Sequence, residues 1–182
     1  MTARHLPNLI SLARLLLALP IVLLILGQHY ELALGLFVCA GLSDGLDGLL
    51  AKRYGWTSTL GGILDPLADK VLLTAVLLAC VSQQLLPLWL AGLAIGRDLA
   101  IGLGALGYRL WVGPYRPAPS LLSKLNTACL LLLLAAVLAQ PTPLPVPPAL
   151  VVALIPLTAV TLTASGLGYL RRGLRAYRRV TS

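Results

Sequence analysis

The chain has 182 residues, about the length of one ordinary domain. Hydrophobic residues make up 58% and charged residues 11% of it, where a typical soluble domain carries roughly 25% charged residues. A soluble chain of this length cannot bury so much apolar side chain. The composition therefore excludes a soluble enzyme, a disordered protein and a disulfide-stabilised secreted module, and it favours an integral membrane protein.

The formal net charge of +8 comes largely from the C-terminal arginines. Because these arginines do not belong to a soluble basic domain, we expect no nucleic-acid partner. We interpret this charge as a surface for anionic lipid headgroups. Three cysteines, Cys39, Cys80 and Cys129, lie far apart in apolar runs, so no zinc or redox spacing is present.

A helix that spans a bilayer needs about 20 mainly apolar residues. Six segments meet this requirement: Asn8–Gly27, Glu31–Arg53, Gly61–Gln83, Pro87–Trp111, Leu121–Gln140 and Pro147–Leu170. We therefore expect an all-α integral membrane protein with six transmembrane helices, formed by a single domain over residues 1–182.

The distribution of basic residues predicts the orientation. The N-terminal tail, every second loop and the tail over residues 171–182 carry Arg4, Lys52, Arg53, Arg116 and the terminal arginines, while the opposite loops have no Lys or Arg. By the positive-inside rule, both termini are expected on the cytoplasmic side.

Four of the six acidic residues fall between Asp44 and Asp69, inside two apolar segments. Asp44 and Asp47 are spaced i,i+3, and Asp65 and Asp69 are spaced i,i+4, so each pair shares one helix face. An antiparallel hairpin that turns near Trp56 would bring the two pairs to similar depths, near the cytoplasmic leaflet. Ionisable residues within a span usually mark a functional site.

Four neighbouring carboxylates cannot all stay charged without cations. Their oxygen ligands favour two divalent cations, Mg²⁺ or Mn²⁺, which would clamp a phosphate-bearing substrate. The alternative is a cluster that is protonated or paired with Lys52, Arg53 and Lys70, but three cations do not balance four carboxylates.

The stretch from Ser43 to Asp69 resembles the signature of the CDP-alcohol phosphatidyltransferases, D-x2-D-G-x2-A-R-x8-G-x3-D-x3-D. Every spacing agrees, and Lys52 stands where the family has arginine. The six-span plan is similar to that of the family as well. The resemblance implies a membrane enzyme that moves a phosphatidyl group from CDP-diacylglycerol to an alcohol and releases CMP.

The resemblance also implies roles for individual residues. Asp44, Asp47, Asp65 and Asp69 would hold the two cations, and Asp69 would also be the catalytic general base. The expected CDP-lipid-binding residues are Pro7, Asn8, Gly48, Lys52, Arg53, Ser58 and Gly61. Lys52 offers a point charge where a forked guanidinium would grip the diphosphate, so we expect Arg53 to share that task.

Two short segments bear on the acceptor. Ile95–Asp98 and Ser123–Thr127 look like the CMP-forming cardiolipin synthases, whose acceptor is phosphatidylglycerol; the alternative is a phosphatidylglycerophosphate synthase that uses glycerol 3-phosphate. The expected acceptor-binding residues are Arg97, Asp98, Lys124, Asn126 and Arg116. Alternatively, Arg97 pairs with a carboxylate of another helix, and Arg116 only snorkels. Because adjacent residues of a helix point apart, Arg97 and Asp98 are not expected to pair.

Two other function classes compete with the enzyme. Carboxylates within a span also serve cation-coupled transporters, but here they gather toward one leaflet and no inverted repeat of broken helices is present. A non-catalytic scaffold leaves the cost of the clustered carboxylates unexplained. The resemblance suggests a homodimer, and the absence of a transit peptide favours the cytoplasmic (inner) membrane of a bacterium.

Overall fold

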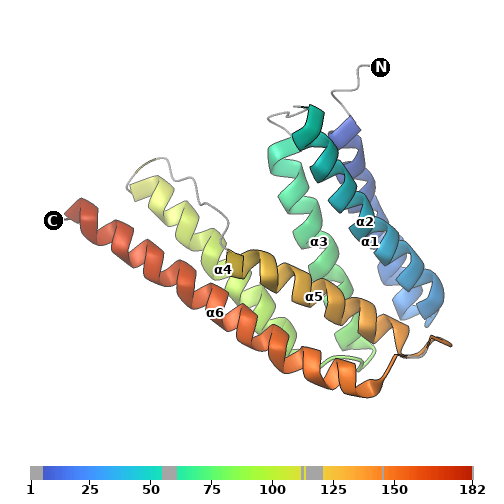
Figure 1. The fold of residues 1–182 in the computed structure, drawn as a ribbon. Coiled ribbons are helices and arrows are strands. Elements are labelled where there is room, and N and C mark those ends of the chain that lie inside the picture. The colour runs from blue at the N-terminus through green and yellow to red at the C-terminus, as the bar shows by residue number, and fades with distance from the viewer. Residues whose placement is uncertain (1–5, 55–60, 112, 114–120, 145, 182) are drawn as a thin grey trace. The chain divides into compact units, whose positions relative to one another are not determined.

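The computed structural model describes residues 6–54, 61–111, 113, 121–144 and 146–181. These residues form six α-helices, shown in Figure 1: α1 (Leu6–Leu26), α2 (Tyr30–Tyr54), α3 (Gly61–Ser82), α4 (Leu88–Trp111), α5 (Leu121–Ala139) and α6 (Pro148–Thr181). The expectation of an all-helical chain is confirmed. The first five helices begin and end within two residues of the predicted spans.

Helix α6 extends well beyond its predicted end. It has 34 residues, which corresponds to about 51 Å at a rise of 1.5 Å per residue, whereas the apolar core of a bilayer is about 30 Å thick. The basic segment expected from Arg171 onward therefore continues the helix. Arginine is a good helix former, so a change from apolar to basic residues does not stop a helix.

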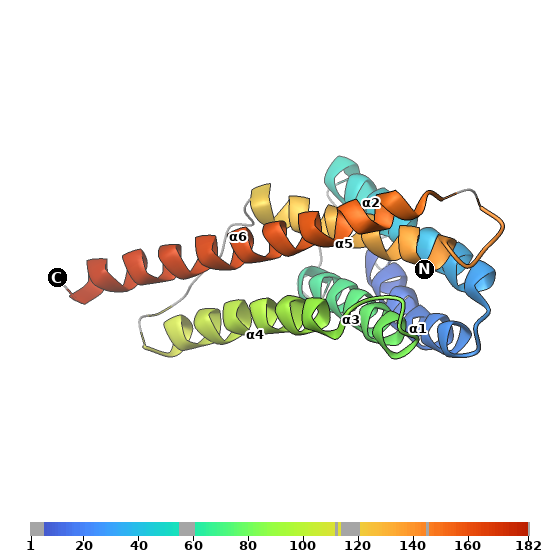
Figure 2. The same cartoon turned by 90° about the horizontal axis from the view of Figure 1, so that it is seen from below.

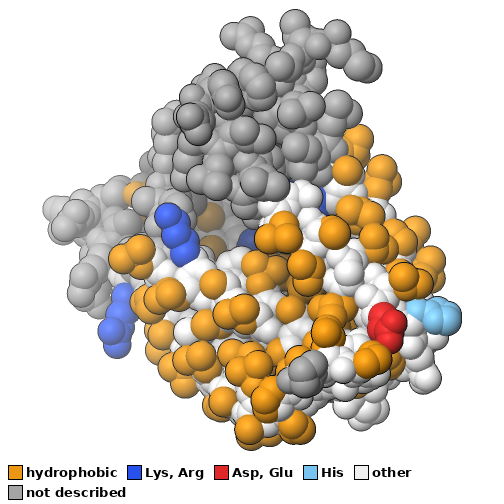
Figure 3. Space-filling model, turned by 45° about the vertical axis from the view of Figure 1, so that its right-hand side comes forward, with side chains coloured by type: hydrophobic (Ala, Val, Ile, Leu, Met, Phe, Trp, Pro, Cys, Tyr) orange, Lys and Arg blue, Asp and Glu red, His pale blue; other side chains and the backbone are white. Residues whose placement is uncertain are grey.

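Three helical stretches are long and apolar enough to cross a membrane by length and composition, namely Leu88–Leu110, Leu121–Ala139 and Pro148–Arg171. Ser11–Leu26 and Tyr30–Ser43 are shorter apolar helices within the part of the chain that could be searched. Many large apolar side chains are exposed, and hydrophobic side chains are spread widely over the described residues on the face shown in Figure 3. An exposed apolar surface of this extent is typical of a membrane protein.

The chain divides into two compact units. The first contains α1, α2, α3 and the C-terminal end of α5, over Met1–Leu86 and Leu134–Pro148. The second contains α4, the remainder of α5 and α6, over Pro87–Leu133 and Ala149–Ser182.

In the first unit, α1 packs against both α2 and α3 (Figure 2). The buried residues of α1 recur every three or four positions and so form one helix face: Ser11, Arg14, Ala18, Ile21 and Ile25. Leucines such as Leu12, Leu16 and Leu19 are exposed on the rest of the helix. Arg14 therefore belongs to the packed face of α1 and is held by its neighbours.

Helices α1 and α3 end in the same backbone motif. After α1, the amides of Gln28 and His29 donate to the carbonyls of Ile25 and Leu24, and the φ of Gln28 is 60°. After α3, Gln84 and Leu85 donate in the same way to Val81 and Cys80, and the φ of Gln84 is also 60°. This Schellman motif normally has glycine at the left-handed position.

We predict that Gln84→Gly stabilises the protein by about 0.5–1 kcal/mol, because glycine adopts a φ of 60° without a clash at Cβ. The shift is measured as an increase in the midpoint of thermal unfolding in detergent. Gln83→Gly is the matched control, since Gln83 does not have a positive φ, and it should lower the midpoint. A lower midpoint for both variants would contradict this account.

Candidate active site

The four aspartates of the predicted cluster lie on two helices of the first unit. Asp44 and Asp47 are in α2, and Asp65 and Asp69 are in α3. The helical backbone keeps the i,i+3 and i,i+4 spacings that place each pair on one face. The side chains of Asp44, Asp47 and Asp65 lie outside the described part of the structure, so the convergence of the four carboxylates stays a prediction.

The carboxylate of Asp69 forms an ion pair with Arg14. Nη1 of Arg14, in α1, donates to Oδ1 of Asp69, in α3. The Arg14 side chain is 2% exposed and the Asp69 side chain is 35% exposed. Burying an unpaired guanidinium among apolar helices costs several kcal/mol of folding free energy. The ion pair with Asp69 avoids this cost for Arg14 and connects α1 to α3. The ion pair also fixes the orientation of the Asp69 carboxylate.

The sequence interpretation did not foresee Arg14 as the partner of Asp69. It considered only Lys52, Arg53 and Lys70, the cations close to the motif. A partial signal was available, because Arg14 lies six residues after the predicted start of the first span (14 − 8) and Asp69 lies eight residues after that of the third (69 − 61). Since α1 begins at Leu6 in the structure, the two offsets are equal there. In two parallel neighbouring helices, equal offsets place residues at similar depth.

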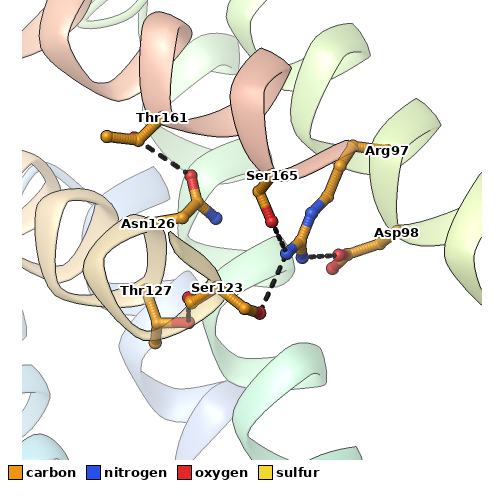
Figure 4. A network of polar contacts seen from close by, with 7 residues as sticks. All are labelled: Arg97, Asp98, Ser123, Asn126, Thr127, Thr161 and Ser165. Atoms are coloured by element: carbon orange, nitrogen blue, oxygen red, sulfur yellow. Dashed lines mark hydrogen bonds and ion pairs between the residues drawn. The ribbon is translucent and has the colours of Figure 1, made fainter. Parts of the chain in front are cut away.

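In the second unit, the guanidinium of Arg97 connects three helices (Figure 4). Nη1 donates to Oδ1 of Asp98 at 2.5 Å, while Nη2 donates to Oγ of Ser165 in α6 at 2.6 Å and to Oγ of Ser123 in α5 at 3.0 Å. The Arg97 side chain is only 9% exposed, and that of Asp98 is 32% exposed. The ring of Tyr169 lies 5.9 Å from the guanidinium carbon, within cation–π range.

The prediction that Arg97 and Asp98 do not pair is wrong. Their Cα–Cβ bonds point apart, as expected for adjacent residues of a helix, but the long arginine side chain turns back far enough for its terminal nitrogen to reach the carboxylate. The ion-pair partner of Arg97 is therefore the carboxylate of the next residue, and not a carboxylate of another helix as the alternative interpretation expected.

The other predicted acceptor residues differ in their surroundings. Asn126 in α5 is 4% exposed, and its Oδ1 accepts a hydrogen bond from Thr161 in α6 at 3.3 Å. Lys124 is exposed. Arg116 lies outside the described residues. The second unit thus brings Arg97, Asp98 and Asn126 into one polar region between apolar helices.

The predicted CDP-lipid residues belong to the first unit. Pro7 and Asn8 are in the first turn of α1; Gly48, Lys52 and Arg53 are in α2; Gly61 begins α3; and Ser58 lies outside the described residues. The contacts of their side chains also lie outside the described part, so their roles stay predictions.

Three residues of α6 contact predicted acceptor residues although no such contact was predicted for them: Thr161, Ser165 and Tyr169. Their spacing of four residues places them on one face of the helix. Single hydroxyl residues in an apolar helix usually serve close packing, which is why the pattern attracted no functional interpretation.

The chemistry of the donor set fits a hard divalent cation, because the four predicted ligands offer only carboxylate oxygens. Among the side chains that the structure describes, no group of three or more metal-binding residues occurs. Of the four aspartates, Asp69 alone has a side chain that the structure describes, and its Oδ1 accepts a hydrogen bond from Arg14.

Comparisons with known proteins agree with the motif. The chain is 38% identical over 154 residues to the chloroplastic CDP-diacylglycerol–glycerol-3-phosphate 3-phosphatidyltransferase 1 of rice, covering 75% of this chain and 47% of the relative. It is 38% identical over 151 residues to the CMP-forming cardiolipin synthase of rat, covering 74% of this chain and 50% of the relative. The chain thus spans about half the length of these relatives.

A bacterial relative is covered more fully. The CDP-diacylglycerol–glycerol-3-phosphate 3-phosphatidyltransferase of Aquifex aeolicus is 36% identical over 126 residues, which is 68% of this chain and 69% of the relative. The profile of the CDP-alcohol phosphatidyltransferases matches residues 4–164. That range contains the whole motif from Asp44 to Asp69, and it covers most of the chain. The chain therefore belongs to the CDP-alcohol phosphatidyltransferase family.

Proposed function

We propose that the protein transfers a phosphatidyl group from CDP-diacylglycerol to phosphatidylglycerol, forming cardiolipin and releasing CMP. The observation that carries this proposal is the partly buried Asp69 carboxylate, which Arg14 holds in place on a helix that keeps the spacing of the family motif. Membership of a transferase family favours this enzyme over the cation-coupled transporter.

Asp69 would act as the general base on the acceptor. It takes the proton of the acceptor hydroxyl while that oxygen attacks the β-phosphorus of CDP-diacylglycerol. A new P–O bond forms, the P–O bond to the CMP moiety breaks, and CMP leaves. The Arg14 contact supports this role because a general base must lie within hydrogen-bonding reach in a fixed orientation.

The remaining residues of the first unit would bind the donor. Gly48, Lys52, Arg53, Ser58 and Gly61, with Pro7 and Asn8, are proposed to contact the CDP-lipid. Two divalent cations, Mg²⁺ or Mn²⁺, when bound by Asp44, Asp47, Asp65 and Asp69, would neutralise the diphosphate and the charge that develops on the leaving group.

The largely buried guanidinium of Arg97 favours an acceptor substrate that carries a phosphate group. This guanidinium is a largely buried cation in the second unit, paired with Asp98, and Figure 4 shows it in the same polar network as Asn126. Lys124 and Arg116 are proposed as further cationic contacts. Both phosphatidylglycerol and glycerol 3-phosphate carry such a phosphate. The second candidate, a phosphatidylglycerophosphate synthase, is favoured by the names of the rice and Aquifex relatives, whereas the rat relative favours cardiolipin synthesis.

The proposal includes a placement in the membrane. We propose six spans with both termini on the cytoplasmic side of the inner membrane, the aspartates toward the cytoplasmic leaflet, and a homodimer. The three long apolar helices support this arrangement, as does the absence of Lys and Arg from the three opposite loops.

We predict that Asp69→Asn abolishes turnover but leaves binding of CDP-diacylglycerol detectable, because an amide cannot accept the hydroxyl proton. Release of CMP and equilibrium binding of the donor are measured on the same purified protein with Mn²⁺. Glu31→Gln is the control, since Glu31 is exposed at the start of α2. Turnover of Asp69→Asn at the wild-type rate would remove Asp69 as the base.

We also predict that Arg14→Met lowers kcat by about 10- to 100-fold, the effect of losing a hydrogen bond to a charged group of about 1.5–3 kcal/mol. Arg14→Lys should be intermediate, because it keeps the charge without the fork. Leu12→Met, at an exposed position of the same helix, is the matched control. A wild-type kcat in Arg14→Met would show that the ion pair does not orient the base.

A further inference from the structure

Ser165 makes the shorter of the two hydroxyl contacts to Arg97, at 2.6 Å against 3.0 Å for Ser123. Ser165 is 0% exposed, so its side chain does not reach the surface of the described structure. Its hydrogen bond with Arg97 is the contact through which it would act on a ligand. The match to the family profile ends at residue 164, and Ser165 lies just beyond it.

The hydrogen bonds of Arg97 define how the guanidinium is held. Nη2 is shared between Ser123 and Ser165, and Nη1 donates to Asp98. Nε is buried without a partner among the described atoms. Buried donors are usually satisfied, and an unsatisfied one calls for a ligand or water that completes the site. The serines thus fix one edge of the guanidinium while donor capacity stays on the rest of it.

The neighbours of Ser165 shape the same side of Arg97. A Cβ on Gly166 would lie 3.5 Å from Cγ of Arg97, so the arginine stem lies directly against the backbone of α6. One turn from Ser165, the ring of Tyr169 lies 5.9 Å from the guanidinium carbon. Figure 4 shows Ser165 and Ser123 approaching the guanidinium from α6 and α5, with Asp98 on its other nitrogen.

We infer that Ser165 is a positioning residue: it sets the guanidinium of Arg97 for the phosphate of the acceptor, so that helix α6 controls acceptor affinity. This inference rests on the proposed role of Arg97. A preorganised guanidinium loses less freedom when it binds an anion, so the contribution of Ser165 belongs to the binding step of one substrate.

The test is steady-state kinetics of the full chain in lipid nanodiscs, with CDP-diacylglycerol and with whichever of phosphatidylglycerol or glycerol 3-phosphate supports CMP release. Ser165→Ala is expected to raise the acceptor KM about tenfold, the effect of one hydrogen bond to a charged group. The KM for CDP-diacylglycerol and kcat at saturating acceptor should not change. Ser165→Thr, which keeps the hydroxyl, should restore the acceptor KM.

Two controls separate positioning from packing. Thr158→Val removes another fully buried hydroxyl of α6 whose Oγ1 has no partner among the described atoms, and it should leave the acceptor KM unchanged. Ser165→Cys keeps nearly the volume of serine but is a weak acceptor, so it should raise the acceptor KM even if Ser165→Ala folds poorly. In an Arg97→Lys background, Ser165→Ala should add little, because the two residues act together.

Several outcomes would overturn the inference. An acceptor KM that is raised by Arg97→Lys but not by Ser165→Ala or Ser165→Cys refutes the role of Ser165 alone. Equal changes in kcat and in both KM values would show a merely structural role, as would an equal effect of Thr158→Val. An unchanged acceptor KM in Arg97→Lys would instead refute the proposed role of Arg97, and absence of CMP release with either acceptor would refute the proposed function.

Discussion

A charged side chain inside an apolar helix must have a partner, and this constraint organises both units of the protein. Arg14 and Arg97 are the two arginines buried among apolar helices in the described part of the chain, and each forms an ion pair with an aspartate. The first pair connects α1 to α3. The second pair joins two neighbouring residues of α4, and its arginine also donates hydrogen bonds to one serine of α5 and one serine of α6. Without these contacts, each buried charge would destabilise the fold by several kcal/mol.

One residue of each ion pair also has a role in the proposed reaction. Asp69 is the proposed base, and Arg97 is the proposed contact of the acceptor phosphate. Packing therefore preorganises both groups before any substrate binds, which reduces the ordering required at binding. In this arrangement the proposed base in α3 is paired with a residue of α1, and an arginine of α4 donates a hydrogen bond to a serine of α6.

Much of the fold is predictable from the sequence, because the first five helices coincide within two residues with apolar segments of about 20 residues or more. The end of α6 is an exception, since arginines continue a helix as readily as leucines do. The partner of Asp69 was not predicted, because Arg14 lies 55 residues away in the sequence and outside the hairpin that carries the motif, at the same offset in α1 as Asp69 has in α3. The pairing of Arg97 with Asp98 was missed because backbone direction does not limit where the end of a long side chain lies.

Ser165 gives no sequence signal that distinguishes it from a packing residue. The side chains of Asp44, Asp47 and Asp65 lie outside the described part, so the most specific part of the motif stays a prediction.

The central claim is phosphatidyl transfer from CDP-diacylglycerol to a phosphate-bearing lipid alcohol. The most direct measurement is CMP release by the purified protein with CDP-diacylglycerol and Mn²⁺, supplied separately with phosphatidylglycerol and with glycerol 3-phosphate. The account predicts release with phosphatidylglycerol alone and cardiolipin as the lipid product. Release with glycerol 3-phosphate alone would contradict the assignment of the acceptor, and no release with either would contradict the proposed function.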